Sequence, residues 1–414
     1  MSQSPVSEKS KDSSIFSTKN SAPESLSNNF PTTVNLAEKN APGKPDLICL
    51  SHLRWDFVYQ RPQHLLNRCA QNYRVFFVEE PVFTAGDTWH LDVSQRDGGV
   101  WVAIPHLPRD LNQEKVIALQ QNLLDELLEK WAIANPVLWY YTPMALSFTF
   151  HLQPQLTIYD CMDELSAFRG APPILQDLEA QLFQKADLVF TGGQSLYEAK
   201  RHRHNNIHPF PSSIEAAHFA QAKQLLPDPA DQAEIPHPRL GFYGVIDERM
   251  DLELIEGIAR ARPDWHLVLV GPVVKIDLAT LPQLPNIHYL GGKSYQELPH
   301  YLAGWDVALL PFARNESTRF ISPTKTPEYL AAGKPVVSTS IQDVVHPYGE
   351  RGLVQIADTV PEFVAAIETC LRPDHYGAEW LEKVDGFLAQ TSWDKTWLKM
   401  GYLINRAIAR RETL

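Results

Sequence analysis

Short apolar runs recur along this chain, and amphipathic helical patterns, notably at 112–133 and 174–185, separate several of them. Strands that alternate with helices favour parallel sheets covered by helices on both faces. The runs form two series, and the chain is long enough for two domains of ordinary size. The strand-like runs lie at 47–50, 75–78, 100–104, 137–141, 156–159 and 187–190 in the first series, and at 239–243, 266–270, 287–290, 306–310, 335–339 and 353–356 in the second.

Changes in composition divide the chain further. Residues 1–44 are rich in Ser, Asn, Lys and Pro and poor in large apolar side chains, which predicts a disordered tail. The first series occupies 45–224, a proline-rich stretch at 225–238 is typical of a linker, and the second series occupies 239–390. This organisation predicts two Rossmann-like α/β domains that face a cleft, with ligands bound at the carboxyl ends of the strands. Residues 391–414 carry an amphipathic helix pattern, and a helix that lies on a membrane surface is one interpretation of it.

Composition narrows the classes of function. Apolar residues make up 44% and charged residues 21%, as in soluble globular proteins. The net charge of −12 argues against general nucleic-acid binding, which needs a basic face. No apolar run reaches the ~18 residues of a membrane span, and the N-terminus lacks the apolar core of a signal peptide. The four cysteines show no ligand spacing and are expected to be thiols in a reducing compartment, so we predict a cytoplasmic protein.

The segment 322–337 is the most informative local motif. It predicts a short helix with a proline in its first turn and a glycine stop, followed directly by a buried strand. Thr324 can cap this helix, Lys325 supplies a cation, and Glu328 lies about one turn inside. Free backbone N–H groups at a helix start attract phosphate, and a carboxylate one turn further on can accept hydrogen bonds from a pair of sugar hydroxyls. The combination suits a nucleotide diphosphate that carries a sugar.

The same segment resembles the nucleotide-sugar site of GT-B glycosyltransferases of the group 1 type, in which a Glu near the start of a short helix holds the ribose. The resemblance rests on Glu328 and on the ending at 333–337, Gly-Lys-Pro-Val-Val. The run at 55–65, Trp-Asp-Phe-Val-Tyr-Gln-Arg-Pro-Gln-His-Leu, is similar to a subgroup that assembles bacterial cell-surface polysaccharides. Many members carry a Glu eight positions before Glu328, where this chain has Phe320; Glu316 is a candidate to reach the same space.

The resemblance implies a GT-B fold with an acceptor domain first, a nucleotide-sugar domain second and a C-terminal helix that crosses back to the first domain. It also implies further donor-site residues. Gly244 lets backbone approach a phosphate, Arg249 neutralises the diphosphate, and the backbone of Gly271 lines the pocket. An alternative stays open, in which Gly244 is only a tight turn and Arg249 pairs with Asp247 or Asp251. The predicted donor-binding residues are Gly244, Arg249, Gly271, Pro323, Thr324, Lys325 and Glu328.

Candidate catalytic residues lie at strand ends of the first domain. Asp163 can act as general base on an acceptor hydroxyl, with Asp160 or Glu164 as substitutes, although a carboxylate here can also simply cap the next segment. His52 can bind donor or acceptor hydroxyls, although a lone histidine is more often structural. Arg54 and Arg61 are either phosphate ligands or surface cations.

These observations predict a hexosyltransferase-like enzyme that moves a sugar from a nucleotide-diphosphate donor to a glycan or lipid-linked acceptor. Helix-start amides, Lys325 and Arg249 would stabilise the leaving diphosphate, so neither a metal nor another cofactor is expected. The protein could contact the inner face of a membrane peripherally. Two alternatives stay open: a nucleotide-sugar epimerase of the same fold, and a non-catalytic scaffold in polysaccharide assembly, which the missing first Glu favours. Retention and inversion at the anomeric carbon also stay open.

Overall fold

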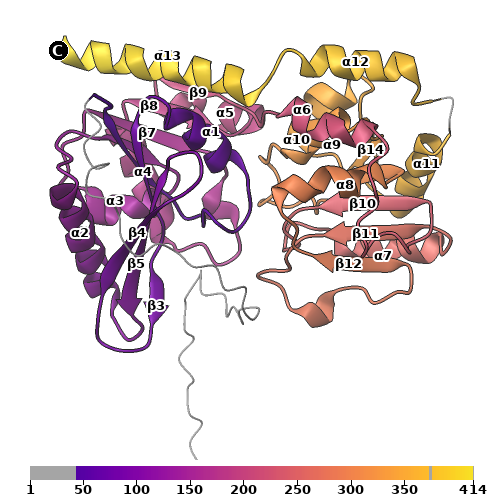
Figure 1. The fold of residues 1–414 in the computed structure, drawn as a ribbon, viewed down its shortest axis with the longest axis horizontal. Coiled ribbons are helices and arrows are strands. Elements are labelled where there is room, and N and C mark those ends of the chain that lie inside the picture. Colours follow the sequence, from indigo (N-terminus) through magenta and orange to yellow (C-terminus); the bar gives the residue numbers. More distant parts are fainter. Residues whose placement is uncertain (1–42, 373–374, 414) are drawn as a thin grey trace, which may run out of the picture.

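The computed structural model describes residues 43–372 and 375–413 as two α/β domains that lie side by side (Figure 1). All but the last two residues of the tail predicted for 1–44 lie outside the described residues. The predicted GT-B architecture of two parallel-sheet domains is confirmed.

The first domain is built on a nine-stranded sheet with the order β3-β5-β2-β1-β6-β7-β8-β9, and β4 pairs antiparallel with β5. The other pairings are parallel, so the carboxyl ends of the central strands lie along one edge. The strands are β1 (Asp46–Leu50), β2 (Arg74–Val78), β3 (Val82–Thr84), β4 (His90–Gln95), β5 (Trp101–Pro108), β6 (Val137–Tyr140), β7 (Leu156–Cys161), β8 (Leu188–Thr191) and β9 (Ile207–Pro209).

Helices cover both faces of this sheet, which explains why its central strands are continuous apolar runs. Side chains of β1 alternate between two cores: Leu47 and Cys49 pack on the side of the first and last helices, and Ile48 and Leu50 on the other side. The helices are α1 (Arg61–Cys69), α2 (Gln113–Lys130), α3 (Leu146–Thr149), α4 (Ile174–Lys185) and α5 (Gln194–Lys200).

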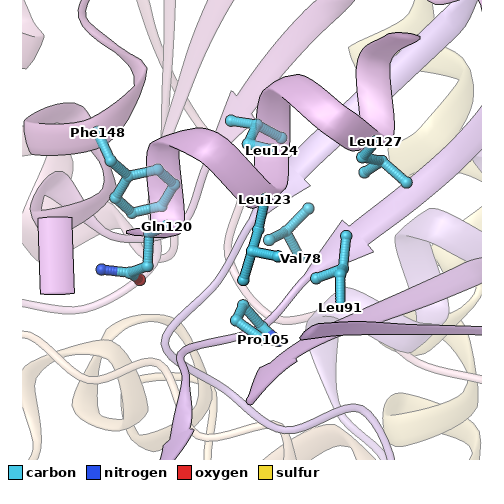
Figure 2. Close-up of a pocket in the computed structure, with 8 residues that line it drawn as sticks. All are labelled: Val78, Leu91, Pro105, Gln120, Leu123, Leu124, Leu127 and Phe148. Atoms are coloured by element: carbon cyan, nitrogen blue, oxygen red, sulfur yellow. The ribbon is translucent and has the colours of Figure 1, made fainter. Parts of the chain in front are cut away.

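A small recess lies beneath α2, against strands β4 and β5 (Figure 2). Its lining is apolar except for Gln120, and it contains no ionisable side chain. The recess therefore offers space between packed elements but no group for acid–base chemistry. It is lined by Val78, Leu91, Pro105, Gln120, Leu123, Leu124, Leu127 and Phe148.

The second domain contains a six-stranded parallel sheet with the order β12-β11-β10-β13-β14-β15 and a single large core. The side chain of Asp251 caps α7 by accepting a hydrogen bond from the Leu254 N–H at 2.9 Å. The strands are β10 (Arg239–Tyr243), β11 (His266–Val270), β12 (Ile287–Gly291), β13 (Val307–Leu310), β14 (Val336–Ser338) and β15 (Gln355–Ile356). The helices are α6 (Ala216–Phe219), α7 (Leu252–Ala261), α8 (Leu298–Ala303), α9 (Lys325–Ala331), α10 (Gln342–Val344), α11 (Val360–Cys370) and α12 (Ala378–Leu388).

The chain reaches the second domain earlier than the composition suggests. Helix α6, which lies within the range 45–224 assigned to the first domain, contacts α8 and α9. The proline-rich stretch 225–238 also packs on the second domain, where Gln232 is fully buried and accepts a hydrogen bond from the Trp305 indole N–H at 2.9 Å. This proline-rich stretch is therefore part of the packed second domain, because its polar side chains form hydrogen bonds with α8 and with segments next to α8.

The last helix, α13 (Trp393–Glu412), returns to the first domain and runs along its top in Figure 1. Trp393, Met400 and Ile404 are buried in the first domain's core, which confirms the predicted crossing helix. The chain thus passes between the domains twice, and the two passages touch. The Ser213 and Thr391 hydroxyl oxygens lie 3.0 Å apart, and the Trp393 N–H donates to the Ile214 carbonyl at 3.3 Å. Among the described residues, no helix is both long and apolar enough to cross a membrane.

Candidate functional site

Glu328 lies in α9 at the carboxyl edge of the second sheet, and it is only 5% exposed. The hydroxyl of Tyr243, the last residue of β10, donates a hydrogen bond to the Glu328 carboxylate. Burial raises the pKa of Glu328 to about 7, although Lys325 and the Tyr243 hydrogen bond both favour its ionised form. A carboxylate poised in this way can accept hydrogen bonds from a ligand's hydroxyls.

Lys325 lies beside Glu328 in a wall made of glycine backbone. A Cβ on Gly244 would lie 2.3 Å from Lys325 Cε, and a Cβ on Gly271 would lie 1.8 Å from the Gly244 carbonyl oxygen. Both glycines also have positive φ, +141° and +149°, so side chains are excluded here by conformation as well as by space. Burial lowers the pKa of Lys325, while the nearby Glu328 carboxylate opposes that shift. The structure therefore brings Gly244, Gly271, Lys325 and Glu328 together.

Arg249 forms an ion pair with Asp247 at 2.7 Å, as one of the two sequence interpretations expected. Asp251 is not its partner, because that carboxylate caps α7. The guanidinium carbon of Arg249 lies 5.7 Å from the centre of the Phe168 ring, which comes from the first domain. Arg249 thus stands at the domain boundary, and its role toward a diphosphate stays a prediction.

Two details of the predicted donor loop are wrong. Thr324 has helical backbone angles and its side chain makes no capping hydrogen bond, so it does not cap α9. Its backbone already continues the turn that starts at Pro323, since the Thr326 N–H donates to the Pro323 carbonyl at 3.2 Å. Glu316 does not reach the space beside Glu328: its side chain is 76% exposed and lies 3.6 Å from Arg319.

Asp163, after β7, is the carboxylate of the first domain that best fits a reacting group. Asp160 is fully buried in a two-pronged ion pair with Arg61, and Glu164 pairs with Lys200 at 2.8 Å, so neither is a substitute base. Among the described residues the Asp163 side chain has no hydrogen-bond or ion-pair partner. Burial raises its pKa to about 6, opposed chiefly by the positive charge of Arg249.

His52 follows β1 at the same sheet edge, and its Nδ1 atom is buried with no hydrogen-bond partner among the described residues. Burial, aided by the charge of Lys275, lowers its pKa to about 4, so the imidazole is neutral near pH 7. Arg54 and Arg61 are structural: Arg54 binds Glu79 at 2.9 Å and Arg61 binds Asp160.

Sequence reasoning missed Glu80, which follows β2 and whose pKa burial raises to about 7 against the charges of Arg54 and Lys275. The signal was available, because this residue lies just beyond the apolar run 75–78 and strand ends of parallel sheets line ligand clefts.

The two sets of residues face each other across the domain boundary. Phe168 lies near both Arg249 and Lys275, with its ring centre 5.7 and 5.8 Å from the two cationic groups. The Arg169 N–H donates to the Glu248 carboxylate at 3.1 Å. The charge of Arg249 acts on Asp163 of the first domain and on Lys325 of the second, so the two domains contribute these side chains to one polar site. Such a site can bind an activated donor on one wall and an acceptor hydroxyl on the opposite wall.

Comparisons with known proteins show which family and which fold this chain resembles. Residues 237–373 match the family model for glycosyl transferases group 1. A protein of Bacillus subtilis (strain 168) named "Putative teichuronic acid biosynthesis glycosyltransferase TuaH" is 29% identical over 276 residues, which cover 60% of this chain and 67% of that protein.

Solved structures share the fold. Sucrose-phosphate synthase from Thermosynechococcus elongatus superposes with a TM-score of 0.68 at 14% identity, over 89% of this chain and all of that one. A UDP-forming α,α-trehalose-phosphate synthase from Burkholderia vietnamiensis gives a TM-score of 0.64 at 14% identity, over 90% of this chain and 100% of the other. The chain thus has the GT-B fold, its residues 237–373 match the group 1 glycosyltransferases, and its curated relative is named as a glycosyltransferase.

Proposed function

We propose that this enzyme transfers a sugar from a nucleotide-diphosphate donor to a lipid-linked glycan or polysaccharide precursor, without a metal ion. The observation that carries the proposal is the placement of Lys325 beside the buried Glu328 carboxylate and against the backbone of Gly244 and Gly271. The glycines leave room for phosphates, the ammonium group neutralises them, and the carboxylate holds the ribose hydroxyls. The relative named for teichuronic acid biosynthesis supports a polysaccharide acceptor.

In this scheme the bond between the sugar and the diphosphate breaks as the acceptor hydroxyl attacks. Negative charge develops on the leaving diphosphate, where Lys325 and Arg249 stabilise it more than in the ground state. Asp163 takes the proton of the acceptor hydroxyl, and neutral His52 holds a neighbouring hydroxyl. Retention or inversion then depends on whether Asp163 assists a direct attack.

The test is release of nucleoside diphosphate from a panel of nucleotide sugars, measured with and without lipid-diphosphate acceptors. We expect release that depends on the acceptor and is unchanged by EDTA. Conversion of the donor without an acceptor would instead favour an epimerase, and nucleotide binding without any turnover would favour a scaffold.

Titration of Glu328 gives the first prediction. Only the ionised carboxylate accepts hydrogen bonds from both ribose hydroxyls, and burial raises its pKa to about 7. We expect a nucleoside diphosphate to bind about tenfold more tightly than its 2′-deoxy form at pH 8, since a charge-assisted hydrogen bond contributes about 1.5 kcal/mol. This ratio should fall toward one at pH 6, because the carboxyl group is then mostly protonated. The phosphate groups of the two nucleotides titrate alike, so their protonation cancels in the ratio of the two affinities.

Calorimetric titration of both nucleotides at the two pH values measures this ratio. The control variant Glu328→Gln should show a small ratio that does not change with pH. An equal preference at pH 6 and pH 8 in the wild type would remove Glu328 from the ribose.

We also propose that the outer face of α13 rests on an anionic membrane surface, where a lipid-linked acceptor would be found. Leu398 and Tyr402 are 71% and 65% exposed and lie one turn apart on this helix. Lys399, Arg406 and Arg410 are exposed on the same side, although the chain as a whole carries a net charge of −12. Exposed apolar side chains beside cations are the pattern of helices that lie at a bilayer surface.

Vesicle co-sedimentation tests this contact. Each Lys or Arg near an anionic surface contributes about 1 kcal/mol, so the double variant K399E/R406E should bind phosphatidylglycerol vesicles at least about tenfold more weakly. The matched control K115E/K130E changes the net charge equally on the exposed side of α2 and should bind like the wild type. Equal binding of both variants, or binding to neutral vesicles alone, would contradict the proposal.

A further inference from the structure

A carboxylate of the second domain is bound at a helix start of the first domain. Asp343, in α10, is 6% exposed. Its Oδ2 atom accepts a hydrogen bond from the Gln194 N–H, and its Oδ1 atom accepts one from the Ser195 N–H, both at 2.9 Å. Both N–H groups belong to the first turn of α5 and have no partner within the helix. The two domains are therefore joined by two charge-assisted hydrogen bonds to one buried side chain.

This contact requires a glycine in the first domain. A Cβ on Gly193 would lie 2.2 Å from Asp343 Oδ2 and 3.1 Å from Ser322 Cβ. The φ of Gly193 is −161°, an extended value that any residue adopts, so the requirement comes from the space and not from the backbone. Gly193 thus permits the close approach of the other domain, whereas a Cβ on its neighbour Gly192 would lie 2.2 Å from the Met162 carbonyl oxygen of the same domain.

The same junction also holds the start of the donor loop. Ser322, which directly precedes Pro323 and the Lys325 site, is bound by Ser212 of the first domain. The Ser212 hydroxyl donates to the Ser322 carbonyl at 2.5 Å, and the Ser212 N–H donates to the Ser322 hydroxyl at 3.3 Å. Phe320 packs against the first domain's core on the side of α2 and α4. Phe320, which stands where the family resemblance expects the first Glu of the pair, therefore makes an interdomain contact in this chain.

We propose that Asp343 is a positioning residue for sugar transfer, which fastens the first domain to the donor loop and so sets the distance between Asp163 and the Lys325–Glu328 pair. The inference rests on the proposed function. Asp343 touches neither substrate. It acts through the Gln194 and Ser195 N–H groups, next to Gly193, whose backbone lies close to Ser322. Transfer needs both reactants within about 3–3.5 Å, and a shift of 1 Å can cost about a hundredfold in rate.

The experiment compares Asp343→Ala with the wild type and with Asp277→Asn, a matched control whose carboxylate caps a helical turn within the second domain. For Asp343→Ala we expect acceptor-dependent kcat to fall about tenfold to a hundredfold. We also expect the Kd for UDP, GDP or ADP, whichever the wild type binds, to change less than twofold. A lower kcat with an unchanged nucleotide Kd distinguishes a positioning role from damage to the donor site. Asp277→Asn should change neither kcat nor Kd.

Small-angle scattering supplies a readout that does not need turnover. With the bound nucleoside diphosphate, Asp343→Ala should have a larger radius of gyration than the wild type, because the domains open. Gly193→Ala should behave in the same way, since its methyl group displaces the carboxylate, and it serves if Asp343→Ala fails to fold. The proposal would be overturned if both variants kept the wild-type radius of gyration and kcat. It would also be overturned if nucleotide binding were lost together with kcat. If the wild type transfers no sugar, the scattering comparison still decides the contact while the proposed function fails.

Discussion

Replacing Asp163 with Asn is expected to lower acceptor-dependent transfer by about 10²–10⁴-fold, the usual contribution of a general base. The substitution keeps the size and shape of the side chain but removes its ability to take a proton. Asp163 is the member of its carboxylate cluster without a described partner, whereas Asp160 and Glu164 are held by Arg61 and Lys200. Folding and nucleotide binding should therefore stay intact, because no ion pair is broken.

The pH dependence of kcat at saturating donor checks the same assignment. The pKa of Asp163 is about 6, and only its ionised form can accept a proton. The rate should rise up to tenfold per unit as the pH increases toward 6 and level off above 7. This rise should vanish in Asp163→Asn and persist in the control Glu164→Gln. A variant that transfers sugar at the wild-type rate, or keeps the same pH profile, would end the proposal.

The stereochemistry of the product follows from the same residue. A base that assists direct attack by the acceptor gives inversion at the anomeric carbon, whereas the intact family Glu pair usually accompanies retention. Proton NMR of the product's anomeric centre distinguishes the two outcomes.

Replacing Lys325 with Ala is expected to weaken nucleoside-diphosphate binding by about ten- to a hundredfold. A Lys–phosphate contact in a partly closed site is a charge-assisted bond of about 1.5–3 kcal/mol, and each 1.4 kcal/mol is a factor of ten in affinity. The glycine wall strengthens this expectation, because Gly244 leaves no side chain between the ammonium group and a phosphate. Calorimetric titration with the diphosphate and with the free nucleoside measures the effect, which should appear only for the diphosphate.

The matched control for this variant is Lys293→Ala. Lys293 also belongs to the second domain but its ammonium group pairs with Asp231 at 2.6 Å, and its loss should leave nucleotide affinity unchanged. Equal diphosphate affinity in Lys325→Ala and the wild type would remove Lys325 from the donor site.

The sequence predicted well those helices, strands and turns that depend on residues close together in the chain. The apolar runs predicted twelve of the strands but missed the short or half-exposed strands β3, β4 and β9. The segment 322–337 gave a helix, a glycine stop and a strand, because these depend on local spacing and on glycine and proline. Fine capping geometry was harder. Thr324 has a residue type that suits a cap, yet it adopts helical angles, because the turn already begins at Pro323.

Features set by distant partners could not be read from the sequence. Arg61 is a structural residue only because sheet order brings it to Asp160, 99 positions away, and Asp343 meets Ser195 across 148 positions. The early passage into the second domain is similar, since α6 has no local signal for the domain on which it packs. Propensity and periodicity carry no information about such pairings.

The two passages of chain between the domains lie against each other, with Ser213 next to Thr391. Two adjacent connections at one edge of the domain boundary form a hinge. Such a hinge allows the two domains to rotate about one axis, and it restricts translation or twisting of one domain relative to the other. If each domain moves as a rigid body, one measured rotation angle would then give the distance between any side chain of the first domain and any side chain of the second.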